Sequence, residues 1–123
     1  MEPTWYNFAD FLAEQLPELR EQIEKSYLSW VDGCGDPYPH VFLDEFIAPL
    51  LLGTGALGDD ATRTRAGEIL DQILVCSDHD LAEAAITSIL EAFRDHAELR
   101  QLAWAYLGPV AREWTTRLVA APL

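Results

Sequence analysis

Apolar residues recur at intervals of three and four through most of the chain, which is the spacing of an amphipathic α-helix. The first such stretch covers about residues 4–15, where Asp10 and Glu14 fall on the side opposite the apolar positions. Those apolar positions are Trp5, Phe8, Leu12 and Leu16. The pattern therefore predicts a first helix with one buried and one solvated face.

A second helix is predicted to begin at Pro17, because proline suits the first helical turn, where the backbone N–H has no helical partner in any case. Its inward positions are Leu19, Ile23, Tyr27 and Trp30. We expect it to end before a loop at residues 33–39, in which glycine, proline and aspartate provide turn chemistry.

From Pro39 the apolar band is too broad to leave one side in water, so the third helix is predicted to be the most buried. The band comprises Val41, Phe42, Phe46, Ile47, Leu50 and Leu51. Pro49 is expected to kink this helix or end it near Ala48, because its ring removes one backbone hydrogen bond and crowds the preceding turn. A loop at residues 53–59 follows.

Three helix starts follow this loop, each marked by an aspartate. Asp59 or Asp60 is expected to cap the first, whose inward positions are Ala66, Ile69, Leu70, Ile73 and Leu74. The next two starts resemble capping boxes with aspartate in place of serine or threonine, at Asp80-x-x-Glu83 and Asp95-x-x-Glu98. The apolar runs behind them are Leu81, Ala85, Ile89 and Phe93, then Leu99, Leu102, Ala103 and Tyr106.

The last turn signal predicts one more helix. Gly108 suits the left-handed position after a helix, and Pro109 suits the first turn of the next, which continues through Val110, Trp114 and Leu118. Seven helices and no convincing strand result, so we predict an all-α bundle forming a single domain over residues 1–123. The four tryptophans fall on inward positions, which favours core packing over a ligand platform. They are Trp5, Trp30, Trp104 and Trp114.

The loop at 53–59 contains the letters of a dinucleotide-binding fingerprint, because Gly53, Gly55 and Gly58 fit G-x-G-x-x-G. That motif works between a strand and a helix, where it aims helix N–H groups at a pyrophosphate. Here the preceding stretch is helical, and Asp59 and Asp60 place negative charge where phosphates would arrive. We interpret the glycines as an interhelical connector and predict no cofactor.

Acidic residues dominate the charge of the chain. It has 21 acids and 8 bases, a formal net charge of −13, and residues 1–60 alone hold 12 acids and 2 bases, or −10. Nucleic acids and anionic membranes bind surfaces rich in lysine and arginine, so we expect this acidic chain to bind neither. A basic protein is the partner that complements its charge. Solubility alone is the competing explanation. The predicted contact residues are Asp10, Glu14, Glu18, Glu21, Asp44 and Glu45.

The remaining composition indicates a cytoplasmic location. The longest stretch without a charge, residues 46–58, is shorter than the roughly 20 apolar residues of a membrane span. The amino end has four acids before its first base at Arg20, unlike a secretory signal. Cys34 and Cys76 are too few for a disulfide framework or a four-cysteine zinc site, and neither has a nearby base to activate it as a nucleophile. We therefore expect reduced, non-catalytic thiols.

A metal site is the alternative suggested by the histidines. His79-Asp80, with His40 upstream and Asp95 downstream, has the residue types of the metal ligands in all-helical HD phosphohydrolases. Such ligands converge from within helices, whereas His79 and Asp80 stand at a predicted helix start, as His96 does after Asp95. No acid and base pair can be selected among so many surface carboxylates. We predict no metal and no catalytic residue.

The second half of the chain resembles a helical repeat. The stretch SDHDLAEAAITSILEAFRDH, residues 77–96, resembles the second helix of a HEAT-like repeat, which implies repeat packing over residues 61–119. The segments YPHVFLDEFIAPLLL and YLGPVAREW make the whole chain similar to small all-helical bacterial proteins, some of which are thought to act as immunity or antitoxin factors. That resemblance implies binding rather than catalysis.

Three hypotheses of function follow. The favoured one is a non-enzymatic module that binds a basic protein, conceivably a toxin, through its acidic front half. The second is a structural or adaptor protein that binds through an apolar groove or forms a homodimer. The third is a metal-dependent hydrolase that uses His40, His79 and Asp80.

Overall fold

The computed structural model describes residues 1–34, 38–54 and 58–121, and in them the chain forms seven helical segments and no strand. The predicted all-α fold is therefore confirmed. In chain order the segments are α1 (Phe8–Gln15), η1 with α2 (Pro17–Leu19, Arg20–Cys34), α3 with η2 and α4 (Pro39–Phe42, Leu43–Ile47, Ala48–Leu52), α5 (Asp60–Val75), α6 with η3 and α7 (His79–Ala85, Ile86–Leu90, Glu91–Asp95), α8 (Ala97–Trp104) and α9 (Pro109–Ala120).

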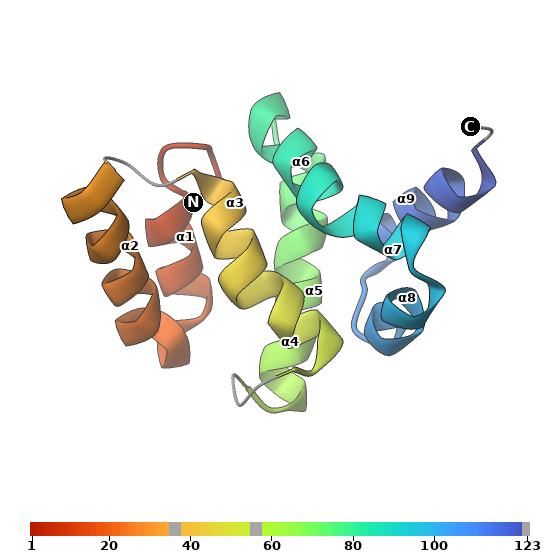
Figure 1. Ribbon diagram of the computed structural model, residues 1–123, viewed down its shortest axis with the longest axis horizontal. Helices are drawn as coiled ribbons and strands as arrows, with labels where there is room; N and C mark the ends of the chain where they lie inside the picture. Colours follow the sequence, from red (N-terminus) through yellow and green to blue (C-terminus); the bar gives the residue numbers. More distant parts are fainter. Residues whose placement is uncertain (35–37, 55–57, 122–123) are drawn as a thin grey trace.

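Helix α5 runs through the middle of the molecule, between two groups of helices (Figure 1). It packs against α4 on one side and against α6 and α9 on the other. Helices α1 and α2 form the opposite end from α9, and α2 lies outermost there, packed on α1 and η1 (Figure 1). This edge position of α2 determines which of its side chains reach the solvent.

One cluster of buried apolar side chains connects these helices, from Phe8 in α1 to Ala111 in α9. The predicted inward positions of α5 are all buried, as Ala66, Ile69, Leu70, Ile73 and Leu74. At the α1 end the rings of Phe8 and Phe42 meet edge to face, with centroids 6.4 Å apart. The three-and-four spacing thus located the core correctly in the central helix.

The third helix is buried as predicted, but it does not end near Ala48. It continues to Leu52, and the π-helical turn η2 lies directly before α4, which carries Pro49 in its first turn. A widened i→i+5 turn is a common place for a helix to adjust around proline, which cannot donate the regular bond. The helix ends at Gly53, whose φ of 70° is the left-handed conformation that glycine adopts without strain.

Only one of the three predicted aspartate caps is correct. Asp59 caps α5, since its Oδ1 accepts the Thr62 N–H at 2.9 Å. Helix α6 is capped by Asp78 instead of Asp80, because Asp78 Oδ1 accepts the Leu81 N–H at 3.2 Å and its Oδ2 also accepts the Trp5 N–H at 2.7 Å. The contact with a residue 73 positions away favours Asp78 over its neighbour.

The second capping box is also absent. His96 occupies the N-cap position of α8 without a side-chain hydrogen bond, and Asp95 pairs with Arg94 at 2.8 Å. A charge-assisted bond to the adjacent guanidinium takes up the carboxylate that the prediction had assigned to the helix start.

Gly108 is not left-handed, since its φ is −77°. A Cβ at this position would lie 2.0 Å from Oδ2 of Asp71, so a larger residue would displace this carboxylate. Asp71 in turn caps α9, accepting the N–H of Ala111 at 2.8 Å and of Val110 at 3.3 Å. Helix α9 begins at Pro109 as predicted.

The inward placement of all four tryptophans is wrong for two of them. Trp5 and Trp104 are partly buried against the core, whereas Trp30 and Trp114 are each 37% exposed. Leu102 was also expected inside and is 56% exposed. In α2 the cause is its edge position, because a helix packed mainly on one neighbour buries only a narrow stripe.

Candidate functional site

A groove lined mostly by aromatic and small apolar side chains runs over α1, α2 and the start of α3. It consists of two adjoining hollows of about 360 and 370 Å³, which share Tyr6, Ala9 and Tyr27 in their walls. The first is completed by Asp10, Ala13, Ile23, Glu24 and Leu28. The second is completed by Trp5, Phe8, Tyr38, Pro39 and Phe42. We call these two hollows together the α1–α2 groove.

Large apolar side chains stand exposed at the rim of this groove. Tyr6 is 96% exposed, Tyr38 65% and Leu28 58%. Trp5 packs edge to face against Tyr38, with ring centroids 6.0 Å apart, and so supports that ring from below the surface. Exposed aromatic clusters of this kind are typical of protein interaction surfaces rather than of inert surface.

Carboxylates lie on both walls of the groove. Asp10 belongs to the α1 wall and Glu24 to the α2 wall, and Glu14 and Glu21 are exposed one turn further along the same helices. The ion pairs within the described part of the chain involve other acids, namely Glu18, Asp95 and Glu113. Asp10, Glu14 and Glu21 were predicted as contact residues, and the fold brings them to this one end.

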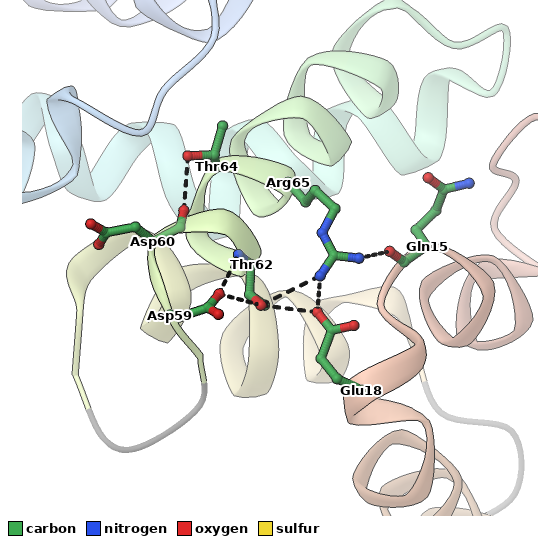
Figure 2. A network of polar contacts seen from close by, with 7 residues as sticks. All are labelled: Gln15, Glu18, Asp59, Asp60, Thr62, Thr64 and Arg65. Atoms are coloured by element: carbon green, nitrogen blue, oxygen red, sulfur yellow. Dashed lines mark hydrogen bonds and ion pairs between the residues drawn. The ribbon is translucent and has the colours of Figure 1, made fainter.

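Glu18, also a predicted contact residue, is engaged inside the molecule. It pairs with Arg65 and accepts the Thr62 hydroxyl at 3.0 Å, while Arg65 also donates to the carbonyl of Gln15 (Figure 2). Partial burial opposes ionisation of Glu18, but hydrogen bonds, including those from Thr62 and Arg65, outweigh it and lower the pKa of the carboxyl. Glu18 therefore joins η1 to α5 and is less available to a partner than the other acids.

Asp44 and Glu45 lie on η2, and both are exposed. Glu45 accepts the Ser26 hydroxyl of α2 at 2.7 Å, so it is adjacent to the outer helix. Partial burial raises the pKa of Asp44, an effect that His40 opposes through its charge. The two acids are placed to extend the acidic surface from α2 onto the third helix.

A second apolar hollow lies at the other end of the molecule, between α8 and α9. Its volume is about 550 Å³, and it is lined by Arg100, Gln101, Trp104, Thr116, Val119 and Ala120. Leu102, Trp114 and Val119 are exposed on the same two helices. We call it the α8–α9 hollow, and its guanidinium distinguishes it from the acidic walls of the α1–α2 groove.

The residues of the metal hypothesis do not converge. His79 and Asp80 are both exposed in the first turn of α6, and Asp95 is paired with Arg94. His40 packs against Trp5, with ring centroids 5.9 Å apart. Throughout the described ranges no group of three or more His, Cys, Asp or Glu side chains is placed to hold a metal ion.

Cys76 is partly buried at the end of α5, where its Sγ lies 3.4 Å from the carbonyl oxygen of Asp78. Burial and the nearby charges of Asp78 and Glu2 raise the pKa of this thiol. A raised pKa reduces the thiolate fraction at neutral pH, in agreement with the predicted lack of activation. The side chain of Cys34 lies outside the description.

The glycine fingerprint follows helix α4 rather than a strand. Gly53 has the ordinary role of a helix C-cap, in which its N–H donates to the Leu50 carbonyl at 3.3 Å and Thr54 N–H donates to Pro49 at 3.0 Å. The central part of the motif, residues 55–57, lies outside the described residues. A dinucleotide site needs a strand before its glycines, and here a helix, α4, takes that place.

Of the two carboxylates that line the groove, Asp10 was among the predicted contact residues and Glu24 was not, and the aromatic rim was not predicted. Tyr6 and Leu28 fall off the helical stripes, and Tyr38 lies in the predicted loop at 33–39. An exposed apolar side chain next to a stripe is unremarkable on its own. What marks these side chains as a candidate site is that they lie beside Asp10 and Glu24, and this proximity arises only when α1 and α2 pack side by side.

Within the described ranges, every helix is too short or too polar to cross a lipid bilayer. Residues 9–119 match the model of a protein family described as a domain of unknown function (DUF7674). The match begins within α1 and ends within α9, so it includes most of the residues that line the groove and the α8–α9 hollow; Trp5, Tyr6 and Phe8 of the groove and Ala120 of the hollow lie outside it. No curated protein and no solved structure matches the chain.

Proposed function

Because the chain belongs to this family, whose description gives no activity, we propose from its own surface that it is a non-enzymatic protein-binding module that recognises a basic protein. One observation supports this most: the α1–α2 groove combines an exposed aromatic rim with carboxylates on both walls. The proposal assigns no catalytic residue and no cofactor.

The two components of this surface have different physical roles. Tyrosine and tryptophan supply much of the affinity at protein interfaces, because their rings bury large apolar areas at little entropic cost. Carboxylates attract a basic partner during diffusion and select against acidic ones. Since 12 of the 21 acids but only 2 of the 8 bases lie in residues 1–60, the attraction is directed to this end.

An immunity or antitoxin role is the specific form of this proposal that the sequence resemblance implies. A basic toxin would supply the required charge, and rigid short helices would supply a preformed face. The HEAT-like packing predicted for residues 61–119 is likewise a proposal, in which α5 to α9 serve as the scaffold behind the binding end. A cytoplasmic location belongs to the same proposal.

Affinity capture with matched charge variants tests the proposal. The front variant Asp10→Asn/Glu14→Gln/Glu21→Gln removes three exposed carboxylates from α1 and α2. The control variant Glu68→Gln/Glu83→Gln/Glu98→Gln removes three exposed carboxylates from the other half. The wild type and the control should capture the same basic protein from native lysate at low salt, and the front variant should lose it. Capture of an acidic protein, or equal capture by both variants, would contradict the proposal.

The α8–α9 hollow favours a second candidate function, a structural or adaptor protein that self-associates. Exposed Val119 lines a hollow of about 550 Å³, and Leu102 and Trp114 are also exposed on the two helices that form it, a combination that an isolated surface seldom leaves open. In that case light scattering of the wild type should give a mass that rises with concentration. The variant Val119→Ser, at the exposed apolar residue that lines the hollow, should remain a monomer.

A further inference from the structure

We propose that the α1–α2 groove binds a cationic amphipathic helix of the partner protein, an inference that rests on the proposed function and gives its recognition site. The occupant is a helix with apolar residues on one face and lysine or arginine on its flanks. The proposal is carried by the shape of the groove, its exposed anchors and its charge.

The shape suits a helix. Two neighbouring helices form the walls, and the α1 wall presents Ala9 and Ala13, one turn apart and both partly buried. Small side chains at this spacing let a third helix approach closely, and the buried side chain of Ile23 lines the hollow from α2. Helices that dock in such grooves insert side chains from successive turns.

The anchors are already exposed at the rim. Tyr6 stands almost wholly in solvent beside the boundary of the two hollows, and Leu28 stands at the outer side of the first. Outside this groove α2 packs mainly on η1 and donates a hydrogen bond from Ser26 to Glu45 of η2, and Trp30 and Val31 are each 37% exposed on it. A partner helix along α2 would cover apolar area that no other element of the described chain covers.

The charge selects a cationic occupant. Asp10 and Glu24 face the groove from opposite walls, so a basic side chain on either flank of the incoming helix would meet a carboxylate. Arg20 and Lys25 are the two bases on α1 and α2, and Arg20 donates to the carbonyl of Ala13 at 3.4 Å. Two bases against the acids of α1, α2 and η2 leave the surface negative.

Fluorescence anisotropy with three designed peptides tests the assignment on the full chain. Each peptide has about 16 residues, roughly the length of α2 when helical. The first has a leucine face with lysine and arginine flanks, the second replaces those bases with glutamate, and the third keeps the bases but replaces leucine with alanine. We expect the first to bind and the other two to bind at least about tenfold more weakly, since one loses the charge match and the other the apolar anchor.

Paired variants locate the binding. Tyr6→Ala/Leu28→Ala removes two rim anchors, and Asp10→Asn/Glu24→Gln removes one carboxylate from each wall. Because these side chains are exposed or line the surface, circular dichroism should show an unchanged fold. Each variant should weaken the first peptide by about tenfold. The matched control Leu102→Ala/Glu113→Gln, in α8 and α9, should leave its affinity unchanged.

Three results would overturn the groove assignment. The first is no binding of the cationic amphipathic peptide, and the second is equal weakening by the groove and control variants. The third is a concentration-dependent dimer abolished by Leu28→Ala, which would make a second copy the occupant. If the basic partner is captured in a charge-dependent way but ignores Tyr6→Ala/Leu28→Ala, the groove fails and the proposed function stands. If no basic partner is captured at all, the proposed function itself fails.

Discussion

The substitution Gly67→Ala tests the packing of the scaffold most sharply. Gly67 is buried in the middle of α5, where a Cβ would lie 1.8 Å from the carbonyl oxygen of Tyr106. Real Cβ contacts below 3.0 Å are essentially absent, so the helix and the segment before α9 would have to separate by about 1.2 Å, the difference between 3.0 and 1.8. The atom in the way is backbone, which cannot swing aside.

Two opposing terms set the size of the effect. Alanine favours the interior of a helix over glycine by about 1 kcal/mol, which would stabilise α5. Overpacking costs about 1–3 kcal/mol, and the displaced segment also carries the Arg63 to Tyr106 hydrogen bond of 2.9 Å and the Asp71 cap of α9. Loss of those bonds adds about 1 kcal/mol each. We therefore expect a net loss of about 2–4 kcal/mol in the free energy of unfolding.

Urea denaturation followed by far-ultraviolet circular dichroism measures this loss. The control is Glu68→Ala, an exposed position next to Gly67 on the same helix, which should change stability by no more than about 0.5 kcal/mol. If Gly67→Ala were as stable as the wild type or more so, helix propensity would outweigh the contact, and the close approach of α5 to Tyr106 would be wrong.

Three further predictions concern aspartates. Asp78→Ala should lower the free energy of unfolding by about 1–2 kcal/mol, because the α6 cap and the acceptor of the Trp5 N–H are both lost; urea denaturation would measure it, and an unchanged midpoint would contradict it. The Thr62 N–H and hydroxyl lower the pKa of Asp59. The Asp59 carboxylate should therefore stabilise the fold at pH values above the ordinary aspartate pKa, and this stabilisation should decline as pH falls through the lowered pKa of the folded state. The melting temperature of Asp59→Asn, measured as a function of pH, should lack this decline. Burial raises the pKa of Asp44, against the opposing charge of His40, so its charged form is disfavoured in the fold and Asp44→Asn should melt no lower than the wild type at pH 7.

Features that depend on local spacing could be predicted from the sequence. The stripe of α5 and the start of α9 at Pro109 follow from helical period and from the place of proline in a first turn. The cap of α6 could not be predicted in this way, because Asp78 and Asp80 lie two positions apart and both suit a helix start. The hydrogen bond from the Trp5 N–H, which comes from the distant amino end, favours Asp78. The role of Gly108 likewise depends on Asp71, which is 37 positions away in the sequence.

The candidate site divides in the same way. The excess of acids in this half of the chain was visible in the charge distribution, but the pairing of Glu18 with Arg65 spans 47 positions and engages one of these acids within the molecule. The exposure of Trp30 depends on α2 being the outermost helix, a fact of tertiary packing that amphipathic spacing does not contain. The aromatic rim is defined only by the meeting of α1, α2 and the start of α3.

The most direct test of the central claim is a map of backbone amide shifts in the isotope-labelled protein during titration with its captured basic partner. The account predicts shifts concentrated in α1, α2 and residues 38–42, which weaken together as salt is raised. Shifts confined to α8 and α9, or shifts at α1 and α2 that are unaffected by salt, would contradict it.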